Sequence, residues 1–232
     1  MADHRLALVV GATRGIGLGV TKALLARGWD VIATARDPAR ATALHALAAE
    51  HLGRVSIPQL DMNDPAAVDG FAATLDGKPL DAVLVNAGVA GPEHRSASAA
   101  TAAEIGALMF TNAIAPVRLA RALIPNLRPG SGVVAFTSSV MGSVAENPGG
   151  HELYRASKAA LNSLTRGLWS EMRSRNLTMV SVHPGWVRTD MAGPSAPVSV
   201  EDSAAGIVTV LEQQSGAHQH RFMDYTGKEL PW

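Results

Sequence analysis

Short apolar runs alternate along the chain with longer segments in which apolar residues recur at helical spacing. The runs are almost continuously apolar, which is typical of parallel strands buried on both faces. The stretches between them leave room for a crossover helix between successive strands. The six predicted strands are Leu6–Val10, Asp30–Ala35, Arg54–Pro58, Leu80–Val85, Gly132–Thr137 and Thr178–His183. The pattern therefore predicts the α/β class, with a parallel sheet flanked by helices on both faces.

Capping residues indicate where several of the helices begin. Residues 15–27 have an apolar face and form the first predicted helix, directly after the first strand. Asp37-Pro38 and Asp64-Pro65 each place a capping acid before a proline at the first helical position. Ser199–Asp202 fits a capping box, and residues 191–198, rich in proline, alanine and glycine, predict a loop before it.

Composition narrows the class of protein. The chain has 232 residues, with 20 Lys and Arg, 20 Asp and Glu, and no Cys. Because it shows no internal repeat and no linker, we expect a single doubly wound, Rossmann-type domain over residues 1–232.

The lack of Cys excludes disulfides, iron–sulfur clusters and thiol catalysis. The balanced charge argues against nucleic acid as a partner. The first apolar run is too short for an export signal or a membrane span, so we expect a cytoplasmic protein without a membrane partner.

Three glycines, Gly11-x3-Gly15-x-Gly17, lie between the first predicted strand and the first predicted helix. Glycine permits a tight turn and a close approach to a pyrophosphate, and a helix N-terminus attracts anions. The segment is not a Walker loop, because no Gly-Lys-Ser/Thr follows. A flexible connection is the alternative, but the strand before the turn and the helix after it favour a nucleotide site.

The end of the second strand bears on which nucleotide binds. An NAD site places an acid at this strand tip for the ribose 2′-hydroxyl, whereas an NADP site places a cation there for the 2′-phosphate. Ala35 stands where the acid would be, and Arg36 follows it. Arg14, in the glycine turn, can reach the same phosphate, and Asp37 is interpreted as a helix cap. We therefore predict NADP(H) in preference to NAD(H); the alternative for Arg36 is a solvated loop charge.

Polar and small residues follow two further strands. Asp61 follows the third strand, where its carboxylate can accept a hydrogen bond from an adenine amino group. Asn86-Ala87-Gly88 ends the fourth strand with side chains small enough for a cofactor to approach. Open α/β sheets bind ligands at these strand ends, although each signal alone is equally typical of an ordinary turn.

Tyr154 and Lys158 are four residues apart in a helical segment, so the phenol and the ammonium share one face. A phenol has a pKa near ~10, and bringing it to ~7 requires about 4 kcal/mol of differential stabilisation. A neighbouring cation acts in that direction, and Lys158 together with an oxidised nicotinamide can supply it. Ser139, or alternatively Ser138, ends the fifth strand and can orient a carbonyl oxygen. No His and acid are spaced for a charge-relay hydrolase.

These motifs, together with Pro184-Gly185, occur in the order and spacing of the short-chain dehydrogenase/reductases, and the chain resembles that family over essentially its whole length. Within the family it is most similar to the C-factor-like carbonyl reductases, through residues 138–143, 154–162, 183–191 and 227–232. Val10 departs from the family, which often has Thr before the first glycine.

The resemblance implies a role for each residue of the site. Ser139 would orient the substrate, Tyr154 would be the acid/base, and Lys158 would hold the nicotinamide ribose and lower the Tyr154 pKa. Asn112 would retain a water in the proton relay, and Thr189 would bind the carboxamide. The implied cofactor contacts are Gly11, Thr13, Arg14, Gly15, Ile16, Gly17, Arg36, Asp61, Met62, Asn86, Ala87, Gly88, Tyr154, Lys158, Pro184, Gly185, Val187 and Thr189.

The implied activity is hydride transfer from NADPH to an aldehyde or ketone, with Tyr154 protonating the oxygen. A nucleotide-binding signalling protein, in which turnover is secondary, is the alternative. The expected partners are a small carbonyl or alcohol substrate and copies of the same chain in a homodimer or homotetramer. We predict no metal site, because His218 and His220 have no third ligand beside them in the sequence. Met141, Trp186 and Met191 are candidate walls of the substrate site.

Overall fold

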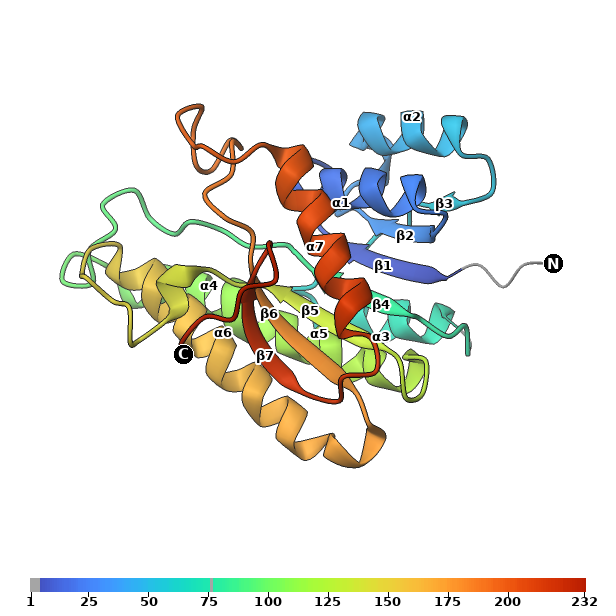
Figure 1. Ribbon diagram of the computed structural model, residues 1–232. Coiled ribbons are helices and arrows are strands. Elements are labelled where there is room, and N and C mark those ends of the chain that lie inside the picture. Colours follow the sequence, from blue (N-terminus) through green and yellow to red (C-terminus); the bar gives the residue numbers. More distant parts are fainter. Residues whose placement is uncertain (1–4, 76) are drawn as a thin grey trace.

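One parallel sheet of seven strands runs through the part of the chain that the computed structural model describes, residues 5–75 and 77–232 (Figure 1). Its strands are β1 (Leu6–Val10), β2 (Asp30–Thr34), β3 (Val55–Ser56), β4 (Ala82–Val85), β5 (Val133–Thr137), β6 (Thr178–His183) and β7 (His220–Asp224). Their spatial order is β3-β2-β1-β4-β5-β6-β7. The chain winds outward from β1 in one direction and from β4 in the other, which opens a crevice at the carboxyl ends of these two strands. Residues 1–4 and 76 of the predicted domain lie outside the described residues.

Helices cover both faces of the sheet (Figure 1). They are α1 (Gly15–Ala26), α2 (Thr42–Glu50), α3 (Pro65–Thr74), α4 (Ala102–Met109), α5 (Ala115–Leu123), α6 (Glu152–Glu171) and α7 (Val200–Gln214). The predicted α/β class with a doubly wound parallel sheet is thus confirmed.

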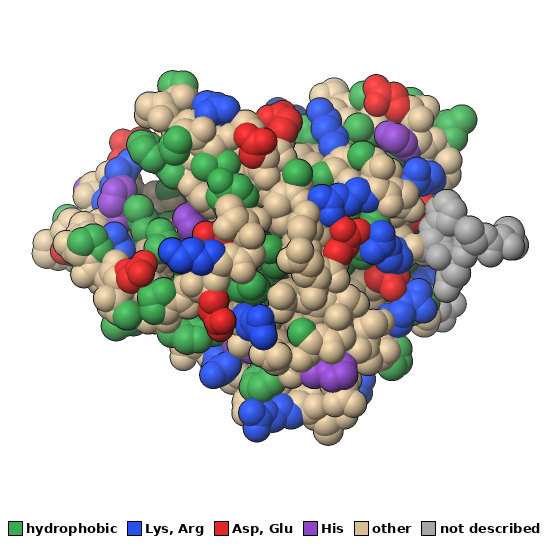
Figure 2. Space-filling model, viewed as in Figure 1, with side chains coloured by type: hydrophobic (Ala, Val, Ile, Leu, Met, Phe, Trp, Pro, Cys, Tyr) green, Lys and Arg blue, Asp and Glu red, His purple; other side chains and the backbone are tan. Residues whose placement is uncertain are grey.

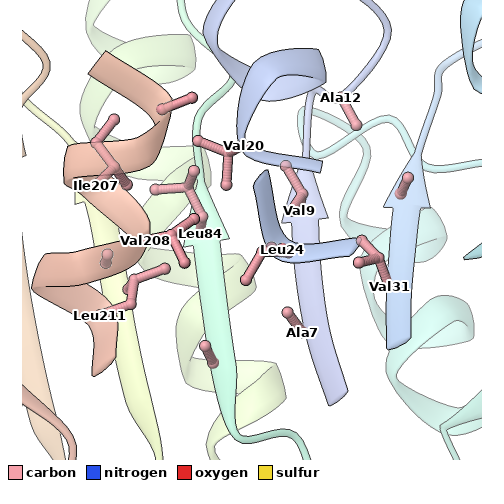
Figure 3. Packing of buried hydrophobic residues seen from close by; sticks show 14 of the residues in the cluster. Ala7, Val9, Ala12, Val20, Leu24, Val31, Leu84, Ile207, Val208 and Leu211 are labelled. Atoms are coloured by element: carbon pink, nitrogen blue, oxygen red, sulfur yellow. The ribbon is translucent and has the colours of Figure 1, made fainter. Parts of the chain in front are cut away.

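The two faces of the sheet support two hydrophobic clusters. Successive residues of β1 alternate between them: Ala7 and Val9 join the cluster under α1, α2 and α7, whereas Leu8 and Val10 join the cluster under α3, α5 and α6. Figure 3 shows the first cluster, in which side chains of α1 and α7 meet above the strands. This alternation explains the nearly continuous apolar runs, since both faces of each inner strand are buried.

All six predicted strands are present, although β3 is reduced to two residues. The seventh strand, β7, was not predicted; it is the last strand of the sheet, pairs with β6, and carries an isolated antiparallel bridge from Met223 to Glu229 on its other side. Arg221 and Asp224 interrupt its apolar pattern. On its outer side β7 meets only the short return of residues 228–230 among the described residues, so it is less enclosed than an inner strand and accommodates such polar positions.

Two of the three predicted caps are confirmed. The Asp64 carboxylate accepts a hydrogen bond from the backbone N–H of Ala66 at 2.9 Å, and the Ser199 hydroxyl accepts one from that of Asp202 at 2.9 Å. The prediction for Asp37 was wrong, because its side chain makes no capping hydrogen bond. Pro38 starts only a single 3₁₀ turn, and α2 begins at Thr42.

Helices α4 and α5 are joined by a π-helical turn, Phe110–Ile114. The helical stretch Ala102–Asn126 is long and apolar enough to cross a membrane by length and composition alone. Half of its most apolar window (50%) is buried inside the fold, and buried core helices commonly pass the same test. The stretch is therefore weak evidence for a membrane span.

Candidate active site

The glycine turn between β1 and α1 leaves no space for a side chain at Gly11 or Gly17. Gly11 and Gly15 have φ values of +79° and +52°, in the left-handed region that favours glycine. A Cβ atom added to Gly17 would lie 2.1 Å from the carbonyl oxygen of Gly11, so a side chain is excluded there. Arg14 occupies the N-cap position of α1 without a side-chain capping bond, and the first turn of the helix contains no acid. This uncapped helix start beside a bare backbone fits a pyrophosphate.

Asn86 links three strands at the floor of the crevice. Its side-chain nitrogen donates to the Gly11 carbonyl at 3.2 Å, and its side-chain oxygen accepts from the Thr137 hydroxyl at 3.1 Å. A Cβ added to Gly11 would lie 2.9 Å from the Cβ of Ala87. Asn86 is therefore more than a turn former, because it holds the glycine turn against the ends of β4 and β5.

The two arginines that were predicted to face one phosphate have different surroundings in the structure. Arg36 is exposed just beyond the end of β2, and its backbone carbonyl accepts from the Gln59 amide at 3.0 Å. Arg14 instead forms an ion pair with Asp190 at 2.7 Å, with 77% and 80% of the two side chains exposed. The Arg14 side chain thus connects the glycine turn to the loop after β6.

Asp61 and Met62 follow β3, as predicted, at the same edge of the sheet. One carboxylate oxygen of Asp61 accepts from the backbone N–H of Asn63 at 2.9 Å, which closes a local turn. Met62 is 6% exposed. The turn engages one Asp61 oxygen, so the second oxygen is the one a ligand would meet.

The segment after β6 returns to the glycine turn. A Cβ added to Gly15 would lie 3.4 Å from the Thr189 methyl group, so Thr189 borders this turn. The Pro184 carbonyl accepts from the buried Ser203 hydroxyl of α7 at 2.7 Å. Val187 forms a bridge with Val198 that closes the loop on itself. The predicted cofactor residues after β6 therefore lie along one anchored loop.

Tyr154 and Lys158 extend from α6 toward the end of β5. The Lys158 ammonium lies 5.7 Å from the centre of the Tyr154 ring and donates to the backbone carbonyl of Thr137 at 2.8 Å. Lys158 is only 4% exposed. The helix thus places a phenol and a buried cation beside the strand that leads to Ser139.

The structure distinguishes the two serines after β5. The Ser138 hydroxyl donates to the side-chain oxygen of Asn162 at 2.7 Å, inside the core. The Ser139 hydroxyl accepts from the backbone N–H of Met141 at 3.1 Å, and among the described residues it donates to no acceptor. Ser139 therefore keeps its proton for a ligand, whereas Ser138 fastens β5 to α6.

Burial controls the acid–base properties of the pair on α6. It raises the pKa of Tyr154 to about 12 and lowers the pKa of Lys158 to about 8. Both shifts favour the uncharged forms. The sequence analysis expected Lys158 to lower the pKa of Tyr154; in the protein alone, desolvation of the phenolate has the larger effect.

Asn112 is fully buried in the π-helical turn. Its side-chain oxygen accepts from the backbone N–H of Val89 at 2.8 Å, and its nitrogen donates to the Val89 carbonyl at 2.8 Å. A Cβ added to Gly88 would lie 3.2 Å from the Asn112 side-chain oxygen and 3.5 Å from the Lys158 nitrogen. Asn112 and Lys158 thus border the same space.

Ser157 and Asn162 were not predicted to lie near the site, although the sequence contains a signal for them. Along α6 the buried polar positions are Ser157, Lys158, Asn162 and Thr165. Buried polar side chains require hydrogen-bond partners. For Ser157 and Asn162 these partners are Asn112 and Ser138, which lie next to the site residues.

Large apolar side chains are exposed on the segments that follow β5 and β6. Trp186 and Met191, two of the predicted walls, are 56% and 55% exposed, and Val144, beyond Ser139, is 74% exposed. Figure 2 shows hydrophobic side chains around a hollow on the side of the molecule that carries the loop 186–198, orange in Figure 1.

A Rossmann-type sheet with a glycine turn, Ser139, Tyr154 and Lys158 at its carboxyl edge defines a nucleotide-dependent oxidoreductase. The model of the short chain dehydrogenase family matches residues 5–198. The chain belongs to the short-chain dehydrogenase/reductase family and is an oxidoreductase that uses a nicotinamide cofactor.

Individual relatives refine this assignment. The C-signal protein of Myxococcus xanthus is 39% identical over 164 residues, which cover 70% of this chain and 98% of that protein. A carbonyl reductase from Pseudomonas aeruginosa PAO1 in complex with NADP is 44% identical, with a TM-score of 0.92 over 99% of this chain and 100% of that one. The NADPH-bound carbonyl reductase from chicken fatty liver is 35% identical, with a TM-score of 0.87 over 99% of both chains.

Proposed function

We propose that the protein is an NADPH-dependent carbonyl reductase that converts an aldehyde or ketone to an alcohol. The observation that supports the proposal is that the buried Lys158 ammonium lies 5.7 Å from the centre of the Tyr154 ring and donates to the carbonyl of Thr137, two residues before Ser139. When bound, NADPH supplies the hydride. The substrate carbonyl accepts a hydrogen bond from the Ser139 hydroxyl, which orients it toward Tyr154.

The pKa values suit the reducing direction. With a pKa raised to about 12 by burial, the Tyr154 phenol carries its proton at neutral pH and can donate it to the developing alkoxide. Lys158, with a pKa lowered to about 8 by burial, is cationic at neutral pH and stabilises the phenolate left behind. Asn112 completes the relay by holding a water beside Lys158.

Replacing Tyr154 with Phe tests the acid/base role. The variant removes only the phenol hydroxyl, so NADPH binding persists while turnover falls by at least about 100-fold, as expected for loss of a general acid. The measurement is NADPH absorbance with a panel of carbonyl compounds, beside a fluorescence titration of NADPH binding. Tyr225→Phe, which removes the hydroxyl of the other tyrosine, is the matched control. Near-normal turnover in Tyr154→Phe would overturn the assignment.

We propose that NADP(H) is preferred because Arg36 faces the 2′-phosphate, and that Arg14 turns from Asp190 toward the same group. Arg36→Ala then weakens NADPH binding by roughly 10-fold, the loss of one charge-assisted contact, and leaves NADH binding unchanged. Calorimetric titration with both nucleotides measures the effect. Arg40→Ala, an exposed arginine in the 3₁₀ turn after Arg36, is the control. Equal binding of NADH and NADPH by the unmodified protein would contradict the preference.

A nucleotide-binding signalling protein is the second candidate, favoured by the similarity to C-signal of Myxococcus xanthus. The presence of Ser139, Tyr154 and Lys158 together favours the enzyme, since binding alone requires none of their acid–base chemistry. The two candidates differ in one measurement: the enzyme oxidises NADPH in the presence of a carbonyl, whereas the signalling protein binds NADPH without consuming it.

We further propose a cytoplasmic, single-domain protein that acts on small molecules, binds neither nucleic acid nor membranes, and assembles into a homodimer or homotetramer. Light scattering after size-exclusion chromatography measures the assembly, and a monomer at micromolar concentration would contradict it.

A further inference from the structure

Ser157 occupies the helix position between the two residues assigned to proton transfer, and its side chain is completely buried. Its hydroxyl oxygen lies 2.8 Å from the backbone carbonyl of Tyr154 and 3.1 Å from the side-chain nitrogen of Asn112. Ser157 thus provides a hydrogen bond between α6, which carries Tyr154 and Lys158, and the π-helical turn that carries Asn112.

The directions of these hydrogen bonds follow from the atoms. The Tyr154 carbonyl can only accept, so Ser157 gives it the single hydroxyl proton. The Ser157 oxygen is then an acceptor for Asn112, which must present its nitrogen to it. The two contacts with Val89 require the same orientation, because the backbone N–H of Val89 meets the Asn112 oxygen.

This arrangement uses both protons of the Asn112 amide, one on Ser157 and one on the Val89 carbonyl. The side-chain oxygen is left with one acceptor position, beside Gly88 and the Lys158 ammonium. A continuous chain of hydrogen bonds therefore runs from the end of β4 through Asn112 and Ser157 to the backbone of Tyr154.

We propose that Ser157 is a positioning residue that aligns Asn112 with Tyr154 and Lys158. It keeps the Asn112 side chain, which serves the proton relay, in a fixed position relative to the acid Tyr154. The inference rests on the proposed reductase function. A serine that bonds the carbonyl three residues earlier is common in helices and can be purely local. The bond from Asn112 is what distinguishes Ser157 from that ordinary case.

The test is a double-mutant cycle on the full-length protein, with Ser157→Ala, Asn112→Ala and the double variant. Ser157→Ala lowers kcat by roughly 10-fold, within the range expected for a misplaced catalytic group, while the Kd of NADPH and the KM of the carbonyl change less than about twofold. In the Asn112→Ala background the same substitution has no further effect on kcat. Ser163→Ala, at an exposed serine of α6, is the matched control.

A second pair of variants distinguishes loss of the Ser157 hydrogen bonds from a simple loss of packing. Ser157→Thr retains the hydroxyl and restores most of kcat, whereas Ser157→Val, of nearly the same shape, does not. The pH profile of kcat, which a merely structural role leaves unchanged, shifts in the Ala and Val variants and returns with Thr.

The outcomes separate the two proposals. If the unmodified protein oxidises no NADPH with any carbonyl of the panel, the proposed function fails. If the protein is active and Ser157→Ala leaves kcat and its pH profile unchanged, or if the effects of Ser157→Ala and Asn112→Ala simply add, the inference about Ser157 is overturned while the function stands.

Discussion

At the scale of single residues, the glycine turn is the most constrained part of the site. A Cβ on Gly17 would lie 2.1 Å from the Gly11 oxygen and 2.9 Å from the Asn86 side-chain nitrogen. Neither neighbour is free to move, because Asn86 also bonds to Thr137 at the end of β5. A change at Gly17 therefore affects both the nucleotide site and the packing of three strand ends.

Gly17→Ala is expected to lower the free energy of unfolding by roughly 1–3 kcal/mol through overpacking and to weaken NADPH binding by more than 10-fold. Urea unfolding and a nucleotide titration measure the two effects. The control is Gly70→Ala in α3, where an added Cβ meets nothing within 4 Å. That variant should gain roughly 0.5–1 kcal/mol from the higher helix propensity of alanine. Equal behaviour of the two variants would contradict this account.

The proposed catalytic residues also show how much can be predicted from the sequence at this scale. Tyr154, Lys158 and Ser139 stand out because their types and spacing match a known chemistry. The choice between Ser138 and Ser139 required the structure, since only the contact with Asn162 shows which hydroxyl is already engaged. The direction of the Tyr154 pKa shift likewise depends on burial, which the spacing of two residues does not report.

At the scale of elements, α1 and α7 are joined by a polar network as well as by the hydrophobic cluster. The Glu212 carboxylate of α7 accepts from Arg27, which caps the end of α1, at 2.6 Å and from the Trp29 ring nitrogen at 3.2 Å. Arg5 pairs with the same carboxylate at 2.9 Å. Burial is the largest single influence and acts to raise the pKa of Glu212, but the hydrogen bonds from Arg27 and Trp29 together with the charges of Arg27 and Arg5 hold the pKa below its usual value.

Glu212→Gln is expected to lower the free energy of unfolding by about 1–2 kcal/mol, because three donors lose their charged partner. The comparison is Glu171→Gln, whose carboxylate pairs with Arg121 while 56% exposed, and which should change stability by less than about 0.5 kcal/mol. Chemical denaturation at neutral pH measures both. Equal losses in the two variants would show that the network adds nothing beyond a surface ion pair.

Elements were predictable to the extent that their residues are enclosed. The inner strands are buried on both faces and can be recognised in the sequence as apolar runs. The edge strand β7 contains Arg221 and Asp224 and therefore lacks such a run. The π-helical turn at Asn112 has no local signature either, since its position depends on contacts with Val89 and with α6.

At the scale of the whole molecule, the buried His220 and the half-buried His183 make stability depend on pH. Burial lowers the pKa of His183 to about 4 and that of His220 to about 3. Asp224 near His183 acts in the opposite direction, and Arg166 near His220 acts in the same direction. The ring Nδ1 atoms of both residues are buried without a hydrogen-bond partner among the described residues.

Acid is therefore expected to destabilise the fold. Below about pH 6.5 the unfolded chain binds protons at these histidines and the folded chain does not. Stability falls by up to about 1.4 kcal/mol per pH unit for each histidine, until the pH reaches the pKa of that residue in the fold. Urea midpoints measured between pH 7 and pH 4 test this expectation. His220→Gln, which does not titrate in this range, should reduce the slope, and an unchanged slope would exclude His220 as a source.

The packing of α1 on α7 also has a consequence for how the chain acquires its fold. Residues 15–26 leave the ribosome early, but the helix that covers them, residues 200–214, is made nearly a whole chain later. Until then the apolar side of α1 shown in Figure 3 can pack against the sheet but not against α7. Such long-range pairing slows folding and leaves apolar surface open to chaperones or aggregation. Competence to bind a nucleotide at the start of α1 should consequently mature only after synthesis is almost complete.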